Sequence, residues 1–367
     1  MSDLLAAWRD RVRAATAATT PLRIVGGGSM DFYGQRLAGE IFEVSDHTGI
    51  VDYDPSELVI TARCGTRLAD VEQVMAQSGQ MLAFEPPHFG PNATIGGSIA
   101  AGLSGPRRPY AGAARDLVLG IRLLDGRGDE LAFGGRVMKN VAGFDVSRFL
   151  AGSLGTLGVI LEVSLKCLPL PRAEMTRTFE LAADEALRRL NAWSATPLPV
   201  SASCWHDERL HVRLSGAESA VAAAVRRLGG ESLENAASYW AAVRDQTHAF
   251  FAPFRAQDGS ETSASRMPTL WRLSVRATAP HARFGGAMMI EWGGSLRWLA
   301  ATEDGVAPQA RAWAAAHGGH ATMFRAVDKS AGVFQPLPPA LLALHQRLKA
   351  ALDPAGIFNP GRMYAEL

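Results

Sequence analysis

Pro91-Asn92-Ala93-Thr94-Ile95-Gly96-Gly97-Ser98-Ile99-Ala100-Ala101-Gly102 is the stretch that decides the fold. Its glycines are paired, the side chains between them are small, and none of its residues is charged. Glycine allows backbone torsions that are closed to other residues, and it lets the main chain approach a ligand closely. From His88 to Ile160 there are 15 glycines in 73 residues, against 37 in 367 overall, so the enrichment extends beyond this stretch. The pattern predicts a backbone wrapped around a flat or phosphorylated ligand, and a glycine-rich surface loop is the alternative.

The overall composition is that of a globular protein with two or three domains. Hydrophobic residues make up 47% of the chain, and 37 basic residues nearly balance 36 acidic ones. Because the net charge is +1 without a long run of like charge, the sequence argues against a nucleic-acid partner. The first twenty residues have several charges and no apolar core, and no apolar run reaches the roughly 18 residues needed to span a bilayer. We expect a cytoplasmic protein that reaches the inner face of a membrane only through partner subunits.

The cysteines and histidines do not have the spacing of a metal or disulfide framework. Cys64, Cys167 and Cys204 lie far apart and form no C-x-x-C pair, so they predict neither disulfides nor an iron–sulfur or zinc site. His317 and His320 are three residues apart, but the two glycines between them favour a turn over a helix. We therefore predict no metal site.

The first half of the chain alternates between helical and strand periodicity. Its predicted elements are helix 3–18, strands 22–25, 41–44 and 58–63, helix 66–78 with Thr66 as N-cap, and strands 117–124, 130–133 and 159–165. Asp125–Gly128 is predicted to be a hairpin turn. Pro169 and Pro171 follow the last of these strands and mark a domain boundary.

The second half has a different order of elements. Strands are predicted at 178–181, 202–206, 210–214, 270–275, 288–292 and 296–299, and helices at 184–193, 218–228, 236–248 and 339–352, with a polar loop at 257–268. This order predicts an antiparallel sheet backed by helices, of ferredoxin-like type. No repeat is visible in the sequence. The predicted domains are residues 1–172, 173–330 and 331–367, the last returning to the first.

Gly26-Gly27-Gly28-Ser29-Met30 follows the first predicted strand directly. A Rossmann turn would need a third glycine at position 31, which is Asp31, and would continue into an apolar helix, which is absent. Three successive glycines and Ser29 can still present several backbone N–H groups to a pyrophosphate as an anion nest.

Several motifs occur in an order that resembles the vanillyl-alcohol-oxidase (PCMH) type of FAD-binding protein. They are the loop 25–34, the block 92–102 with Arg115-Asp116, the segment 139–165 and the tail 348–362. Glu85–His88, Ala101–Arg108, Trp292–Leu299, Gly318–Thr322 and Asn359–Leu367 further resemble the family of FAD-binding E subunits of bacterial glycolate oxidase (glycolate dehydrogenase). The resemblance implies an α+β fold: a PCMH-type FAD-binding domain of two α+β subdomains, plus a ferredoxin-like antiparallel cap domain.

The resemblance also implies FAD as cofactor, held by backbone N–H groups of glycine-rich turns. The matching residues are Gly26, Gly27, Gly28, Ser29 and Met30 in the first loop; Thr94, Gly96, Gly97, Ser98 and Gly102 in the second segment; Gly152, Gly158, Val159 and Ile160 in the third; and, in addition, Pro87 and Arg107. A tight turn without a ligand is the alternative for Gly152–Gly158, and Arg107 contacts either the diphosphate or a partner. Ser29 and Met30 stand where some members carry a histidine that attaches FAD, so we expect non-covalent FAD.

Oxidation of a 2-hydroxy acid needs a cation for the carboxylate and a base for the hydroxyl proton. His320, Arg297 and Arg325 are the candidates, with arginine favoured for the carboxylate because its fork binds both oxygens. The alternative is that the two arginines are solvated residues at strand edges and that His320 has only a structural role.

The resemblance implies an FAD-binding subunit of a glycolate dehydrogenase complex that oxidises glycolate to glyoxylate. The implied partners are a homologous catalytic FAD subunit and an iron–sulfur subunit that accepts the electrons. The histidine-rich H-x-G-D-G-N motif of self-sufficient members is absent, which favours dependence on these partners. Within the complex, the chain either oxidises substrate itself or serves as a flavin-bearing relay. A stand-alone FAD-dependent D-2-hydroxyacid dehydrogenase of D-lactate type and a non-catalytic assembly subunit are the alternatives.

Overall fold

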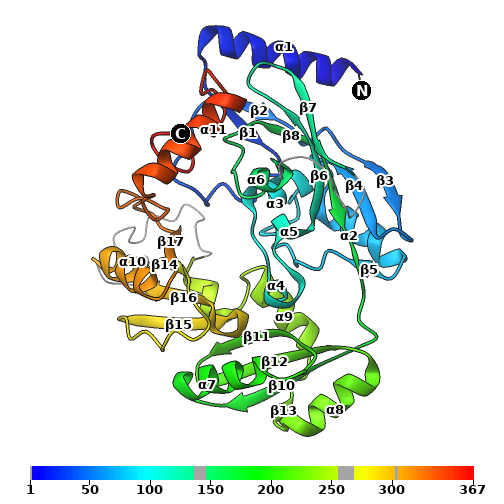
Figure 1. Cartoon of the computed structure of the whole chain (residues 1–367), viewed down its shortest axis with the longest axis vertical. Coiled ribbons are helices and arrows are strands. Elements are labelled where there is room, and N and C mark those ends of the chain that lie inside the picture. The colour runs from blue at the N-terminus through cyan, green and yellow to red at the C-terminus, as the bar shows by residue number, and fades with distance from the viewer. Residues whose placement is uncertain (1, 136–145, 255–267, 302–304) are drawn as a thin grey trace. The chain divides into compact units, whose positions relative to one another are not determined.

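The computed structural model describes residues 2–135, 146–254, 268–301 and 305–367, which form two compact units (Figure 1). Unit 1 comprises Met1–Ser104, Gly112–Leu170 and Pro336–Leu367, and unit 2 comprises Gly105–Ala111 and Pro171–Gln335. Gly105–Ala111, which the sequence-based boundaries assign to the first domain, thus groups with unit 2. Residues 139–145 of the third motif and nearly all of the predicted loop 257–268 lie outside the described residues.

Unit 1 is built around a five-stranded antiparallel sheet with the order β3-β4-β8-β6-β7. Its elements are α1 (Ser2–Ala18), β1 (Leu22–Val25), β2 (Glu40–Glu43), β3 (Ile50–Asp54), β4 (Val59–Arg63), α2 (Leu68–Gln77), β5 (Gln80–Met81), α3 (Ile95–Ala101), α5 (Ala114–Leu117), β6 (Val118–Leu124), β7 (Glu130–Gly134), α6 (Val146–Leu150), β8 (Val159–Lys166), β9 (Leu168–Pro169) and α11 (Pro339–Leu352). The central strand β8 is buried along nearly its whole length. This explains its almost continuous apolar sequence, since both of its faces are covered.

All elements predicted for unit 1 are present. The strands β3, β5 and β9 and the helices α3, α5 and α6 were not predicted, and the N-cap of α2 is Arg67 instead of Thr66. The Thr66 hydroxyl donates to the carbonyl of Arg63 at 2.7 Å and accepts from the N–H of Gly49 at 2.9 Å. Because this side chain already connects two loops, it does not cap the helix.

The C-terminal segment is tied to β1. The N–H of Leu22 donates to the carbonyl of Ile357 at 2.7 Å, and the N–H of Asn359 donates to the carbonyl of Leu22 at 2.9 Å. β1 also pairs in parallel with β2, so it is held on both sides. The loop that follows β1 therefore starts from a fixed position.

A buried lysine secures this C-terminal segment. Lys349 on α11 donates from Nζ to Asp353 Oδ2 at 2.7 Å and to the carbonyls of Thr156 at 2.6 Å and Phe358 at 2.8 Å. Asp353 in turn accepts the N–H groups of Ile357 and Phe358. All three ammonium protons thus have a partner, which is what a buried cation requires.

Unit 2 is an eight-stranded antiparallel sheet with the order β13-β10-β12-β11-β15-β16-β14-β17. Its elements are α4 (Arg108–Ala111), β10 (Ala173–Glu180), α7 (Ala183–Ser194), β11 (Val200–His206), β12 (Arg209–Gly216), α8 (Glu218–Leu228), β13 (Glu231–Ser232), α9 (Ala236–Arg244), β14 (Thr269–Ser274), β15 (Gly286–Glu291), β16 (Leu296–Ala301), α10 (Val306–Ala316) and β17 (His320–Arg325). Of these, α4, β13, α10 and β17 were not predicted.

This sheet consists of two halves with the same ferredoxin-like strand order. If the strands of each half are numbered along the chain, the first half (β10–β13) has the order 4-1-3-2 from its outer edge inward. The second half (β14–β17) has the same order, read from the opposite edge of the sheet. The halves meet where β11 pairs with β15 through Cys204↔Glu291 and Trp205↔Ile290. The repeat is one of topology and is not visible in the sequence.

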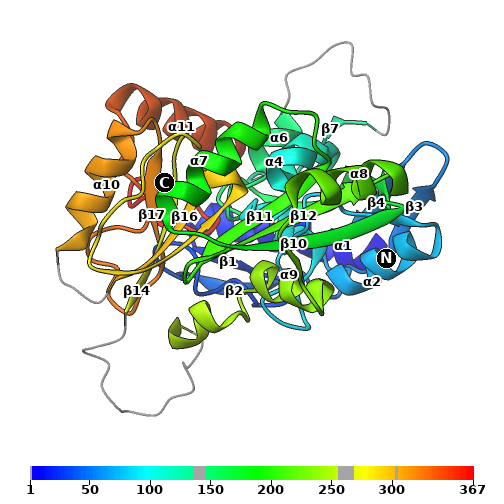
Figure 2. The same cartoon turned by 90° about the horizontal axis from the view of Figure 1, so that it is seen from below.

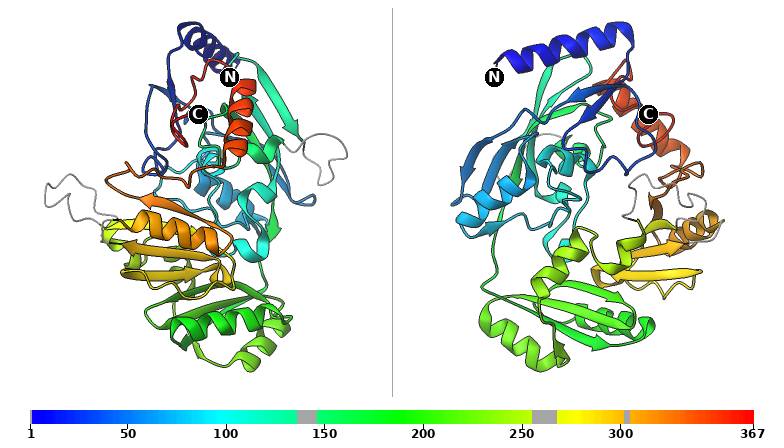
Figure 3. Two further views of the ribbon diagram at one scale, coloured as in Figure 1. Left: turned by 60° about the vertical axis from the view of Figure 1, so that its left-hand side comes forward. Right: turned by 180° about the vertical axis from the view of Figure 1, so that it is seen from behind.

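Helices α7, α8 and α10 supply residues to one hydrophobic core on a single face of this sheet. Figure 2 shows α7 and α8 along β10 and β12, and α10, which is labelled in Figure 1 and orange in Figure 3, lies beside the strands of the second half. In β12, Leu210, Val212 and Leu214 belong to this core, and the residues between them face the other way, as the pleat requires. On that opposite face, Trp240 of α9 donates to the hydroxyl of Thr176 at 2.9 Å.

Candidate functional site

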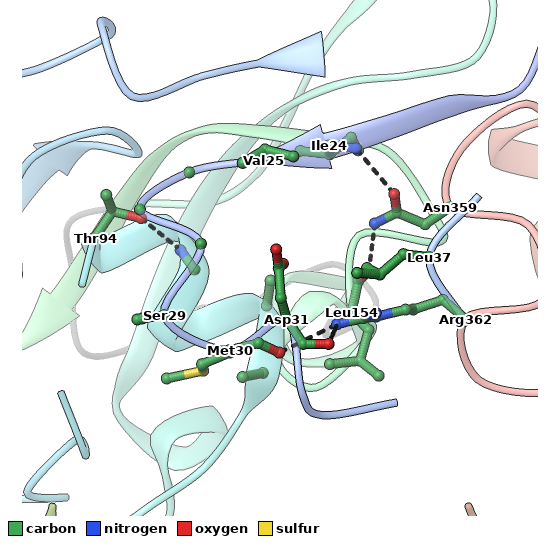
Figure 4. Close-up of a pocket in the computed structure, with 16 residues that line it drawn as sticks. Ile24, Val25, Ser29, Met30, Asp31, Leu37, Thr94, Leu154, Asn359 and Arg362 are labelled. Carbon is green, nitrogen blue, oxygen red and sulfur yellow. Dashed lines mark hydrogen bonds between the residues drawn. The ribbon is translucent and has the colours of Figure 1, made fainter. Parts of the chain in front are cut away.

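A groove in unit 1 opens where β1 ends (Figure 4). It contains about 580 Å³ of empty space, part of which is open to solvent. The lining residues are Ile24, Val25, Gly26, Gly27, Gly28, Ser29, Met30, Asp31, Leu37, Thr94, Gly97, Ala100, Ala101, Leu154, Asn359 and Arg362. They come from the loop after β1, from α3, from the turn before β8 and from the C-terminal segment.

The loop after β1 presents unpaired backbone donors to this groove. None of the N–H groups from Gly26 to Met30 donates a hydrogen bond to the part of the chain that the structure describes. A Cβ added at Gly27 would lie 1.5 Å from the carbonyl oxygen of Asn92, so only glycine fits at this crossing of two backbones. Successive N–H groups of this kind form a concave site for an anion.

Helix α3 forms the floor of the groove. Thr94 is its N-cap and accepts the N–H of Gly97 at 3.2 Å, and Gly102 ends the helix with φ +63°. The residues that α3 turns toward the groove are glycine and alanine, which keep the backbone accessible to a ligand. Ser98 is buried, and its hydroxyl has no hydrogen-bond partner among the described residues.

A second pocket adjoins the first and shares Ile24, Gly26, Gly97, Ala100, Leu154 and Asn359 with it. Its further lining residues are mostly apolar: Val44, Cys64, Gly96, Gly155, Gly158 and Ile160. Burial raises the pKa of the Cys64 thiol to about 12, so this cysteine stays protonated and unreactive. The pocket therefore offers an apolar wall next to the anion-binding loop.

The rim of the groove is held by the C-terminal segment. Asn359 accepts the N–H of Ile24 at 2.9 Å and donates to the carbonyl of Leu154 at 2.7 Å. Arg362 donates from Nη2 to the carbonyls of Met30 at 3.1 Å and Asp31 at 3.2 Å. Burial lowers the pKa of Arg362 to about 10, which still leaves it charged at neutral pH. The groove thus combines backbone donors with the buried cation Arg362 and with the carboxylate of Asp31, which is paired with Arg23.

Ten of the residues predicted to bind a cofactor line these two pockets. They are Gly26, Gly27, Gly28, Ser29, Met30, Thr94 and Gly97 in the groove and also Gly96, Gly158 and Ile160 in the apolar pocket. Asn359 and Arg362 also line the groove. They belong to a motif that resembles the family, but the sequence does not predict that they contact the cofactor. The signal that could identify them is the polar pair in Asn359-Pro360-Gly361-Arg362, next to the strand-like Ile357-Phe358.

The other predicted cofactor residues have different surroundings. Gly102 packs against Gly152, since a Cβ at Gly102 would lie 2.7 Å from the Gly152 Cα, so close backbone packing accounts for both glycines. Pro87 and Val159 are buried, and neither lines the groove. These surroundings agree with a structural role.

Arg107 belongs to unit 2, where it binds Glu174. Its Nη2 donates to Glu174 Oε2 at 2.8 Å, and Arg213 lies 3.8 Å from the same oxygen. Burial raises the pKa of Glu174, but the two arginines and the hydroxyl of Ser215 outweigh it and hold the pKa below its usual value. The contacts of Arg107 therefore do not support the prediction that it binds a diphosphate.

The three predicted catalytic residues are not brought together. Leu273 pairs with Arg297, and the next residue of β14, Ser274, pairs with His320. Paired residues share a face and successive residues alternate, so Arg297 and His320 project from opposite faces of the sheet. Arg325 lies at the other end of β17 from His320, roughly 16 Å away at 3.3 Å per residue.

Arg297 has a structural role. It is fully buried, and it donates to the carbonyls of Gly294 at 2.7 Å, Pro280 at 3.1 Å and Ala279 at 2.8 Å. Burial lowers its pKa to about 10. These contacts do not support the prediction that Arg297 binds a substrate carboxylate, because its guanidinium holds backbone carbonyls on the helix-covered side of the sheet.

The described residues contain no group of three or more histidine, cysteine or acidic side chains placed to hold a metal ion. His317 follows α10, and its ring lies 4.4 Å from that of Trp313. Within the described ranges, no helix is both long enough and apolar enough to cross a bilayer.

The chain matches two family models. Residues 6–134 match a family described as FAD binding domain, and residues 327–363 match a family described as FAD linked oxidases, C-terminal domain. The groove lies where these segments meet, since its lining residues come from both of them and from Leu154. FAD is therefore the cofactor of this chain.

Known proteins resemble the chain over different lengths. It is 47% identical over 366 residues to the glycolate oxidase subunit GlcE of Escherichia coli, which covers 100% of this chain and 99% of that protein. It is 32% identical to the glycolate oxidase subunit GlcD of Bacillus subtilis over 127 residues, which are 35% of this chain and 27% of that one. The solved structure of p-cresol methylhydroxylase matches 98% of this chain and 87% of its own with a TM-score of 0.65 at 13% identity, which confirms the predicted fold class.

Proposed function

Because this chain belongs to the family of the glycolate oxidase subunit GlcE, we propose that it is the FAD-binding subunit of a multi-subunit glycolate dehydrogenase. The match of nearly half of all residues over the full length of both proteins carries this proposal. The complex would oxidise glycolate to glyoxylate, and the electrons would pass through flavin.

The groove of unit 1 fits the diphosphate of FAD. The unpaired N–H groups from Gly26 to Met30 would bind the phosphate oxygens, with Arg362 as the nearby cation. The apolar pocket beside Gly158 and Ile160 would hold the less polar parts of the cofactor. When bound, FAD supplies the acceptor for the hydrogen removed from carbon.

We propose a homologous catalytic FAD subunit and an iron–sulfur subunit as the partners. The similarity to GlcD, another glycolate oxidase subunit, supports the first of these. The absence of any C-x-x-C pair in the sequence supports the second, because the iron–sulfur centre would need another chain. Contact with a membrane would occur through these partners.

A stand-alone dehydrogenase of D-lactate type is the second candidate. A D-lactate dehydrogenase of Anaerostipes hadrus is 30% identical to this chain, but only over 40% of it and 30% of that protein. The GlcE match extends through both units, so we favour the subunit of a complex. Rates measured with a panel of 2-hydroxy acids, on the purified chain and on the complex, would separate the two candidates.

Co-purification from cells that express the natural level of the chain tests the proposed function. We expect glycolate-dependent dye reduction in a complex that contains this chain, a second flavoprotein and iron. Full activity of the chain alone would support the stand-alone enzyme. A pure chain without flavin absorbance would support the non-catalytic assembly subunit.

Acid precipitation is expected to release FAD into the supernatant and leave a colourless pellet. The reason is that Ser29 and Met30 lack the imidazole that attaches FAD in some flavoproteins of this type. Absorbance at the usual flavin wavelengths in both fractions measures the outcome. Yellow colour in the pellet would contradict non-covalent binding.

His320 is proposed as the proton acceptor for the substrate hydroxyl. Burial and the positive charge of Arg272 both lower its pKa below 6.5, so the imidazole is neutral at pH 7 and can accept a proton. We expect kcat/KM to stay constant from about pH 8 to about 6.5 and to fall below that. His320→Gln should lower kcat and remove this dependence, and an unchanged profile would rule out His320 as the base.

A further inference from the structure

Arg272 lies on β14, one strand in from the sheet edge, on the face that carries His320. On β14, Arg272 lies opposite Trp298 of β16 on one side and Thr322 of β17 on the other. His320 is two residues from Thr322 on the edge strand β17, so it is the diagonal neighbour of Arg272, at roughly 7–8 Å between Cα atoms. The same register places Arg297 on the opposite face.

Two indole rings hold the guanidinium of Arg272 in place. Its Cζ lies 5.2 Å from the ring centroid of Trp292 and 6.0 Å from that of Trp298. Both rings are buried and anchored: Trp298 Nε1 donates to Glu291 Oε1 at 2.7 Å, and Trp292 Nε1 donates to the carbonyl of Gly105 at 3.0 Å. A planar cation oriented in this way is well suited to bind a carboxylate.

A second arginine adds positive charge at the same place. Arg108 of α4 lies with its Cζ 4.5 Å from the ring centroid of Trp292. The two guanidinium groups lie over one indole, and the buried carboxylate of Glu291, which accepts from Trp298, offsets part of their charge. The pKa of His320 is lowered mainly by burial and in addition by the positive charge of Arg272.

We propose that Arg272 binds the carboxylate of a small 2-hydroxy acid on this face of unit 2, with Arg108 adding positive charge and His320 beside it. This inference rests on the proposed function and names the substrate-binding residue that the three residues predicted from the sequence do not provide. It assigns substrate binding to this chain rather than to its partner alone. Trp292 and Trp298 are positioning residues that act through Arg272.

Steady-state kinetics of the complex test this proposal. Arg272→Gln is expected to raise the KM for glycolate by about tenfold or more, with a smaller change in kcat, because the lost interaction binds the non-reacting carboxylate. Arg272→Lys keeps the positive charge but loses the guanidinium that binds both carboxylate oxygens. Its KM should therefore lie between that of the wild type and that of Arg272→Gln. Arg226→Gln, at an exposed position of α8 on the other side of the sheet, is the matched control and should leave KM unchanged.

Oxalate binding to the FAD-loaded chain, measured by isothermal titration, is the second test. The wild-type chain should bind oxalate, and Arg272→Gln should weaken that binding by about tenfold or more with FAD content and Tm retained. If wild-type complex oxidises glycolate but Arg272→Gln and Arg272→Lys change neither KM nor oxalate affinity, this inference is wrong and the proposed function stands. If the wild-type complex does not oxidise glycolate, the proposed function itself fails.

Discussion

Gly27→Ala is expected to yield a protein with less than about a tenth of the normal FAD content, a loss of more than about 1.4 kcal/mol in binding. The added methyl carbon would lie 1.5 Å from the carbonyl oxygen of Asn92, so one of the two backbones must move. Any such movement displaces the N–H groups from Gly26 to Met30, which in the proposed site bind the diphosphate together. The ratio of flavin absorbance to protein absorbance measures the loss.

Gly135→Ala is the matched control for this variant. Among the described residues, a Cβ at Gly135 would meet no atom within 4 Å, and the backbone of Gly135 does not need a positive φ. It should therefore retain full FAD content and activity. If Gly27→Ala also kept its FAD, the diphosphate would have to bind elsewhere than at the loop after β1.

Lys349→Met is expected to destabilise the fold by about 3–5 kcal/mol, because it leaves the carboxylate of Asp353 buried without its cation. The two carbonyls of Thr156 and Phe358 also lose their donor. A loss of this size corresponds to a decrease in Tm on the order of 10 °C, which thermal denaturation measures. FAD should be released at a lower temperature as well, since this lysine holds the segment that carries Asn359.

Arg347→Ala is the control on the same helix, and because this residue is exposed its Tm should change little. The double variant Lys349→Met with Asp353→Asn should lose less stability than the sum of the two single variants, because neither charge is then left alone. Strict additivity would show that the two side chains do not act as a pair.

Most of the β strands could be predicted from the sequence, because their apolar runs are bounded by turn residues that act locally. The prediction failed for α3, whose Gly96-Gly97 pair has low helix propensity. The caps of that helix, Thr94 and Gly102, were present in the sequence, but the loop interpretation of the glycines concealed them. Tertiary packing against β8 overrides the propensity here.

The candidate site could be predicted only where its parts are contiguous. The loop 26–30 is a single motif, whereas Asn359 and Arg362 reach the groove from the far end of the chain, which no local pattern reveals. The predicted catalytic residues do not lie together for another reason. The register decides which face of the sheet a strand residue points to, and a shift of one residue moves its side chain to the other face. Arg297 and Arg272 lie on opposite faces, and the register became known only from the pairing of β14 with its neighbours.

The bonds between Leu22 and the segment Ile357–Asn359 set the order of events in biosynthesis. The ribosome makes the loop after β1 early and the residues that close the rim of the groove almost last. A nascent chain lacks the residues that close the rim, so we expect the complete groove to form only after translation has passed Arg362. Loading with FAD is accordingly expected to follow translation, and a chain truncated before Asn359 is expected to purify with less flavin than the full chain.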